Sequence, residues 1–318
     1  MQTIQQEIDE RTKLTSSNKL ELLLFRLGED AHLDRNELFG INVFKIREII
    51  PMPAITAVAG SHPNMMGVVD LRGQIIPVID LPAVAGCTPK TGLNILLITE
   101  YARSTQAFAV ESVEDIVRLD WRQVLSAEGN AAGGMVTSLA RLDGENSDRL
   151  AQVLDVETIL RKVMPPGEEE IDASRIGSTV NLKPGTAILA ADDSLIARTM
   201  IEQGLEAMGL PYIMCKTGKE AWDQLQSISD KAQAEGNTVH DRIALVLTDL
   251  EMPEMDGFTL TRNIKQDPRF GSIPVVIHSS LTGSTNEAHV KKVGADAYVA
   301  KFVAEDLANA LRQALRGE

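Results

Sequence analysis

Five side chains with acid, hydroxyl or amine groups come within two residues after short apolar stretches in the C-terminal part of the chain. They are Asp192, Asp193, Asp249, Ser279 and Lys301. Three carboxylates that lie together repel one another, and a hard divalent cation such as Mg²⁺ relieves the repulsion. One carboxylate can then act as a nucleophile and form an acyl phosphate. The set therefore predicts a magnesium-dependent phosphoryl-transfer site, in which Ser279 and Lys301 contact the phosphoryl oxygens.

Each of these residues also has an ordinary structural explanation. Asp193 or Ser279 could be the N-cap of a following helix, and Lys301 could be a surface lysine. The residues occur together on four predicted strands in the right order, and this joint pattern favours a site over separate structural roles.

The elements that would position these residues alternate along the chain. Strand-like apolar runs are predicted at 187–191, 212–215, 244–247, 274–277 and 297–300, with helical periodicity between them. Alternating buried strands and helices indicate a parallel, doubly wound α/β sheet. In such a sheet the functional loops lie beyond the carboxyl ends of the strands, so the five side chains are expected at one edge.

Four segments around these residues resemble the motifs of response-regulator receiver domains. They are residues 190–193, 247–257 (LTDLEMPEMDG), 274–279 and 298–301. The resemblance extends over about 186–317 and implies the flavodoxin-like fold of that family.

The resemblance also implies a role for each residue. Asp249 would accept a phosphoryl group from a histidine kinase. Asp192 and Asp193 would hold Mg²⁺ together with Asp249, and the backbone carbonyl of Glu251 would complete the protein ligands. The remaining implied roles are a switch hydroxyl, an aromatic side chain that changes rotamer with it, and a phosphate-binding amine: Ser279, Tyr298 and Lys301.

One position departs from the receiver pattern. Phe302 follows Lys301, where the family usually has a proline, commonly with a cis bond. The departure bears on the geometry of this loop and not on the charge of the lysine. A phosphatase of the haloacid-dehalogenase type is disfavoured, because it needs a second aspartate at position 251, which is glutamate. The chain also contains no G-x-G-x-x-G, P-loop or G-x-S-x-G motif.

The N-terminal half has a different pattern. Short apolar stretches are separated by turn residues, at 20–27, 39–43, 67–69, 75–79, 95–98, 106–110, 116–119, 136–142 and 150–153. This spacing predicts an all-β barrel or sandwich. Helical pieces are predicted at 44–49 and 157–163, and Gly73 predicts a hairpin turn.

Three stretches of this half resemble the CheW-like coupling domain of chemotaxis: 39–50 (FGINVFKIREII), 67–81 (GVVDLRGQIIPVIDL) and 107–119 (AFAVESVEDIVRL). The resemblance covers nearly all of 20–165. It implies a pair of small five-stranded, SH3-like barrels that hold chemoreceptors to the histidine kinase CheA. Three residues match family positions of receptor or kinase contact: Ile46, Glu48 and Arg72. The alternative is that Ile46 belongs to the core and that Glu48 and Arg72 form a solvated ion pair.

Composition limits the remaining choices. The chain has 318 residues, 44% of them hydrophobic, which suits about two globular domains. The net charge of −14 argues against nucleic acid as a partner. Two distant cysteines cannot make a disulfide framework or a cysteine-based zinc site. No apolar run approaches the ~20 residues that span a bilayer, and the first 19 residues contain no signal-peptide core. A cytoplasmic location without membrane insertion is therefore expected.

The predicted organisation is a polar arm or short helix at 1–19, a coupling domain at 20–165, a linker at 166–185 and a receiver domain at 186–318. This combination resembles the CheV family. It implies an adaptor for chemotactic adaptation at receptor arrays on the inner face of the membrane, controlled by phosphorylation. The chain would be a phosphoacceptor rather than an enzyme, with autodephosphorylation as a further activity. The alternative is a phosphate sink for CheA. A DNA-binding regulator is disfavoured, because neither a helix-turn-helix nor a basic patch follows the receiver.

Overall fold

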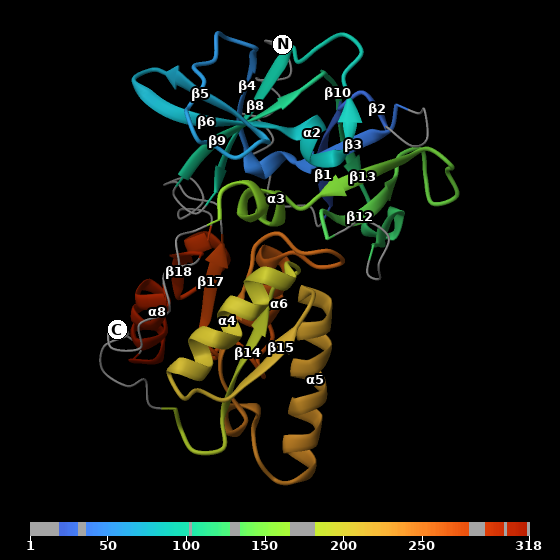
Figure 1. Ribbon diagram of the computed structural model, residues 1–318. Helices are drawn as coiled ribbons and strands as arrows, with labels where there is room; N and C mark the ends of the chain where they lie inside the picture. The colour runs from blue at the N-terminus through green and yellow to red at the C-terminus, as the bar shows by residue number, and fades with distance from the viewer. Residues whose placement is uncertain are drawn as a thin grey trace. The chain divides into compact units, whose positions relative to one another are not determined.

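The computed structural model describes residues 19–30, 36–101, 104–127, 134–165, 182–279, 290–301 and 304–316. The chain divides into two compact units, with the division after Gly167. The first unit is built mainly from strands, and the second contains one sheet covered by helices (Figure 1). Most of the predicted arm, and residues 166–181 of the predicted linker, lie outside the described residues.

Two larger sheets and one short ribbon form the first unit. The six strands of one sheet are β1 (Leu20–Arg26), β3 (Leu38–Asn42), β10 (Ser112–Leu119), β11 (Val124–Ser126), β12 (Val136–Arg141) and β13 (Leu150–Leu154). Their order is β10-β1-β3-β13-β12-β11. The five strands of the other are β4 (Ile46–Pro51), β5 (Met65–Leu71), β6 (Gln74–Asp80), β8 (Ile95–Tyr101) and β9 (Ser104–Val110), in the order β4-β8-β9-β6-β5. The resemblance implies five strands in each of two barrels. In the described residues the second sheet has five strands, whereas the first has six.

The first unit also contains the short ribbon and several short helical segments. β2 (Glu29–Asp30) pairs antiparallel with β7 (Cys87–Thr88). The helical segments are η1 (Val43–Lys45), α2 (Leu81–Ala85), η2 (Trp121–Gln123) and α3 (Val156–Val163). The helix predicted at 157–163 is therefore confirmed.

Apolar side chains form the interior of the first unit. β1 is buried over nearly its whole length, because it lies between β10 and β3. Phe25 of β1 stacks on Phe39 of β3, with ring centroids 6.3 Å apart. One apolar cluster, which includes Leu22, lies on the six-stranded sheet. Another, which includes Val78, lies on the five-stranded sheet, so each sheet has its own apolar core.

The segment predicted to be helical at 44–49 is mostly a strand. After the one-turn η1, whose Phe44 N–H donates to Asn42 Oδ1 at 3.1 Å, β4 begins at Ile46 and pairs antiparallel with β8. The helix prediction is wrong because β4 is rich in isoleucine, which packs well on a pleated sheet, and its partner strand is almost fifty residues away.

The turn predicted at Gly73 is confirmed as a two-residue hairpin between β5 and β6. Leu71 pairs with Gln74, and Arg72 and Gly73 occupy the turn with φ angles of +55° and +84°. The N–H of Gly73 donates to Asp70 Oδ1 at 2.7 Å. Positive φ at both central positions matches the twist of the strands, and it places Arg72 at the hairpin tip.

The second unit has a single parallel sheet. Its strands are β14 (Ala187–Ala191), β15 (Tyr212–Cys215), β16 (Ile243–Thr248), β17 (Val275–Ser279) and β18 (Ala297–Ala300), in the order β15-β14-β16-β17-β18. All neighbouring pairs are parallel. The five strands predicted for this half are therefore confirmed.

Helices pack on both faces of this sheet. They are α4 (Leu195–Ala207), α5 (Gly218–Ala234), α6 (Gly257–Gln266) and α8 (Ala304–Arg316), with the short η4 (Val239–Asp241). One apolar cluster joins the sheet to α4 and α8 through Leu205 and Leu311. The other joins it to α5 and α6 through Leu225 and Leu260. The doubly wound architecture is thus confirmed.

Two further expectations bear on the whole chain. None of the helices in the described part of the chain is long and apolar enough to cross a membrane. Cys87 and Cys215 are both buried, and neither forms a disulfide.

Candidate functional site

The carboxyl ends of four adjacent strands carry the predicted site residues. Asp192 and Asp193 follow β14, Asp249 follows β16, Ser279 ends β17, and Lys301 follows β18. Backbone hydrogen bonds continue past the strand ends: Asp249 N–H donates to Ala191 O at 2.9 Å, and Lys301 N–H donates to Ser279 O at 2.9 Å. The sheet therefore brings all five residues to one edge.

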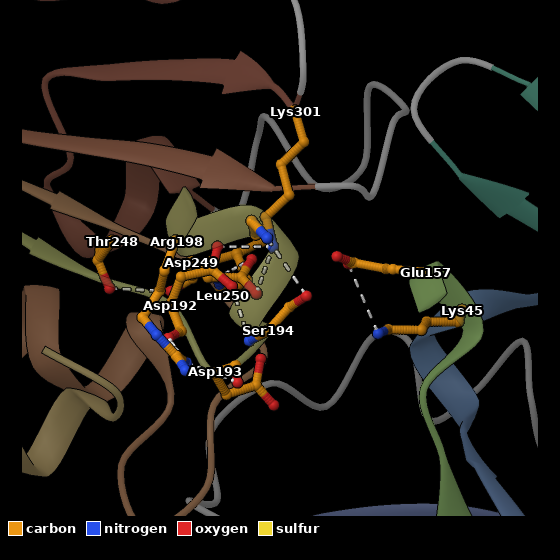
Figure 2. Close-up of polar contacts among 11 residues, drawn as sticks. Lys45, Glu157, Asp192, Asp193, Ser194, Arg198, Thr248, Asp249, Leu250 and Lys301 are labelled. Carbon is orange, nitrogen blue, oxygen red and sulfur yellow. Dashed lines mark hydrogen bonds and ion pairs between the residues drawn. The ribbon is translucent and has the colours of Figure 1, made fainter. Parts of the chain in front are cut away.

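Three carboxylates and one ammonium group meet at this edge. One carboxylate oxygen from each of Asp192, Asp193 and Asp249 lies within 4.8 Å of the others. Lys301 Nζ lies 2.8 Å from Asp192 Oδ2 and 2.9 Å from Asp249 Oδ2 (Figure 2). The Lys301 side chain is fully buried. We call these four residues the carboxylate cluster; in its ionised form it keeps two negative charges in excess.

The second oxygen of each buried aspartate accepts a backbone hydrogen bond. Ser194 N–H donates to Asp192 Oδ1 at 3.0 Å, and Leu250 N–H donates to Asp249 Oδ1 at 2.7 Å. Ser194, not Asp193, is the N-cap of α4, because its side chain accepts from Ala197 N–H. Asp193 is therefore not the N-cap of this helix. Lys301 is not a surface lysine, because its side chain is fully buried.

Two residues that the sequence analysis did not single out hold the backbone of Asp249. Thr248 Oγ1 donates to the Asp249 carbonyl at 2.9 Å. A Cβ on Gly257 would lie 2.0 Å from that same carbonyl oxygen, so only glycine fits there. The chain closes this loop through Gly257 N–H, which donates to Leu250 O at 2.9 Å.

The other predicted receiver residues lie within three residues of the carboxylate cluster in the sequence, or at the end of the neighbouring strand β17. Ser279 is fully buried. Tyr298 is half-buried in β18, where it pairs with Ile277. Glu251 is half-buried, two residues after Asp249. The roles implied for these three residues stay predictions, and Phe302 lies outside the described residues.

A buried histidine precedes the predicted switch residue. Burial, and to a lesser degree the positive charge of Lys301, lowers the pKa of His278 to about 3. The imidazole is therefore neutral at physiological pH and leaves Lys301 as the positive charge of the carboxylate cluster.

The donor set suits a hard divalent cation. Carboxylate oxygens are the ligands that Mg²⁺ takes in proteins, usually with retained waters. Three carboxylates with one converging oxygen each, and an excess of negative charge, fit such an ion. The described residues therefore agree with the magnesium expectation in their chemistry.

The three predicted contact residues of the first unit divide into one core residue and one surface pair. Ile46 is only 3% exposed and belongs to the interior, which favours its explanation as a core residue. Arg72 Nη2 contacts Glu48 Oε1 at 2.7 Å, and the Arg72 side chain is 74% exposed. Glu48 and Arg72 thus form an ion pair at the surface of the five-stranded sheet.

Each unit matches a known family model. The CheW-like domain model matches residues 21–164. The response regulator receiver domain model matches residues 188–312. Both families agree with the sheets and site geometry described above.

Three relatives from Helicobacter pylori match most of the chain. Chemotaxis protein CheV3 is 31% identical over 91% of this chain and 92% of its own length. Chemotaxis protein CheV2 is 29% identical over 93% of this chain and 94% of its own length. Chemotaxis protein CheV1 is 28% identical over 97% of each. With a CheW-like unit, a receiver unit and full-length relatives of this kind, the chain belongs to the CheV family of chemotaxis proteins.

Proposed function

We propose that this chemotaxis signalling adaptor couples chemoreceptors to the histidine kinase CheA, and that phosphorylation of Asp249 regulates the coupling. The observation that carries the proposal is the carboxylate cluster in a chain that also has a CheW-like unit. The surface pair of Glu48 and Arg72 is our candidate for partner contact. Such an adaptor would act in the cytoplasm, in receptor arrays at the inner face of the membrane.

The transfer step uses the carboxylate of Asp249 as the nucleophile. Its oxygen forms a bond to the phosphorus of a phosphohistidine while the N–P bond breaks. The electron pair of the broken bond stays on the imidazole nitrogen, which takes up a proton. Lys301, now 2.9 Å from Asp249 Oδ2, would then contact the new phosphoryl oxygens.

A bound Mg²⁺ would be held by Asp192, Asp193, Asp249 and the backbone carbonyl of Glu251. When bound, it would supply positive charge against the phosphoryl oxygens during transfer. The acyl phosphate would later be lost by hydrolysis, which the same residues could assist.

The acyl phosphate adds negative charge and strong acceptor oxygens at the sheet edge. Ser279 ends the neighbouring β17 and offers a hydroxyl donor, and Tyr298 lies on β18 beyond it. We propose that these two side chains change arrangement on phosphorylation and so alter the surface around β17 and β18.

The test is phosphotransfer from radiolabelled CheA in the presence of Mg²⁺. The wild-type chain should take up label, and Asp249→Asn should not. Asp256→Asn is the matched control, because Asp256 lies in the same loop, caps α6 by accepting from Thr259 N–H, and can be replaced by another good cap. No transfer to the wild type from a kinase that labels another regulator would refute the receiver role.

A second assay distinguishes regulation from a phosphate sink. If Asp249 regulates coupling, Asp249→Asn should change how receptors control kinase activity in reconstituted arrays. If that control is unchanged while other phosphorylated regulators persist longer, the chain is a sink.

A further inference from the structure

Arg198 reaches back from α4 to the turn that carries two of the aspartates. Its Nη1 donates to the backbone carbonyl of Asp192 at 2.9 Å and to that of Asp193 at 2.8 Å. Its own N–H donates to Ser194 O at 3.0 Å, so the base of the side chain is anchored in the first turn of the helix. Figure 2 shows the side chain beside Asp192 and Asp193. This arginine is half-buried.

The contact acts on a very short connection. β14 ends at Ala191 and α4 begins at Leu195, so three residues join strand to helix. The last of them, Ser194, is held by its capping bond. The two bonds from Arg198 hold the peptide groups of the other two, and a charged donor strengthens each bond. The orientation of a peptide group limits where the side chain of its residue can point.

We propose that Arg198 is a positioning residue, which holds the turn at 192–194 so that the carboxylates of Asp192 and Asp193 converge on the cation site. The inference rests on the proposed function, because it assumes that this cluster binds Mg²⁺. Outer residues that orient metal ligands typically contribute 10- to 100-fold to metal affinity.

Two effects of the guanidinium oppose each other. Its positive charge repels a cation, whereas its hydrogen bonds preorganise the ligands. Nη1 is bonded to the carbonyls rather than to the carboxylates. The side chain is also partly exposed, so solvent screens its charge. Preorganisation is therefore the larger effect, and losing Arg198 weakens Mg²⁺ binding.

The first test is calorimetric titration of the full-length chain with Mg²⁺ alone. Arg198→Gln should weaken binding about tenfold. Arg198→Lys, which keeps one charged donor for the two carbonyls that Nη1 contacts, should restore most of the affinity. Arg269→Gln is the charge-matched control, since Arg269 pairs with Asp267 in the segment between α6 and β17, which enters the sheet from the opposite edge.

The second test is labelling of Asp249 by acetyl phosphate as a function of Mg²⁺ concentration. Here an Asp249 O–P bond forms, the P–O bond to the acetyl group breaks, and acetate leaves. Arg198→Gln should raise the half-saturating Mg²⁺ concentration about tenfold and keep most of the rate at saturation. A purely structural role would instead lower the saturated rate and leave half-saturation unchanged.

The outcomes separate this inference from the proposed function. If the wild type binds Mg²⁺ and is labelled, but Arg198→Gln binds Mg²⁺ equally well or more tightly, the positioning role is wrong and the proposed function stands. If the wild type neither binds Mg²⁺ nor accepts phosphate, both are wrong.

Discussion

Replacing Lys301 by methionine removes a fully buried positive charge from between two buried carboxylates. Methionine has a similar length and adds no new polar group. In the wild type, Nζ lies 2.8 Å from Asp192 Oδ2 and 2.9 Å from Asp249 Oδ2. The variant keeps both carboxylates in place, so it tests the electrostatic role of the lysine rather than its packing.

The loss of stability can be bounded in two ways. Removing one partner of a buried ion pair typically costs about 3–5 kcal/mol. The folded variant can also relieve the repulsion by protonating one aspartate. That costs about 1.4 kcal/mol for each pH unit above an ordinary pKa of about 3.9, or about 4 kcal/mol at pH 7. Protonation of one aspartate therefore limits the loss of stability to about 4 kcal/mol at pH 7. We expect Lys301→Met to lower the free energy of unfolding by about 3–4 kcal/mol at this pH.

Protonation of an aspartate also makes the stability of the variant depend on pH. The folded variant binds more protons than its unfolded chain between pH 7 and 4, so its stability relative to the wild type rises as the pH falls. At pH 5 the limit drops to about 1.5 kcal/mol. Added Mg²⁺ should also stabilise the variant more than the wild type, because the cation replaces the missing charge and no longer competes with Lys301.

The assay is urea denaturation at pH 5 and pH 7, with EDTA or Mg²⁺. The chain has two tryptophans. In a Trp121→Phe background, Trp222, which packs edge-to-face on Phe270, reports on the second unit alone. Lys219→Met is the control, because Lys219 forms an exposed ion pair with Asp223 that should contribute less than about 1 kcal/mol. Two results would refute the electrostatic role of Lys301. One is that Lys301→Met lowers the free energy of unfolding by less than about 1 kcal/mol, and the other is a larger decrease that depends on neither pH nor Mg²⁺.

Three further predictions concern the loop of Asp249 and its neighbours. Glu254 has a φ of +65°, so Glu254→Gly should raise the free energy of unfolding by about 0.5–1 kcal/mol, as measured with urea; a loss would contradict the strain. Gly257→Ala should lower it by about 1–3 kcal/mol and slow labelling of Asp249, because the new Cβ meets the Asp249 carbonyl; unchanged labelling would be the contrary result. The pKa of His278 is lowered to about 3, so the folded state binds fewer protons than the unfolded chain below pH 6.5. Its contribution to stability therefore falls by about 2 kcal/mol from pH 7 to 5, and His278→Val should abolish that slope in pH-dependent denaturation.

The position of the site could be predicted because it depends on local sequence and one topological rule. Each of Asp192, Asp249 and Lys301 directly follows a strand, and the carboxyl ends of parallel strands share one edge. The hairpin turn at Arg72 and Gly73 could also be predicted, because a two-residue turn depends on local sequence.

The contacts that hold the site could not be predicted in the same way. The close approach of Gly257 to Asp249, and the double ion pair of Lys301, join residues that are far apart or lie on opposite sides of a loop. Arg198 gives no signal in a sequence, because an arginine in the first turn of a helix is common. Strand β4 is likewise beyond a local prediction, because its pairing with β8 is a long-range property that outweighs the helical periodicity of its sequence.

The two functions that remain for the receiver unit differ in what they require of the rest of the chain. A phosphate sink needs only the carboxylate cluster and a kinase nearby. A regulated adaptor needs a free-energy coupling between phosphorylation of Asp249 and partner binding by the CheW-like unit, typically about 1–3 kcal/mol, or five- to 150-fold in affinity. Such coupling is reciprocal for equilibrium binding. Because Asp249→Asn would abolish phosphorylation under either function, loss of label would identify the acceptor, and the effect of the variant on partner binding and receptor control would separate adaptor from sink.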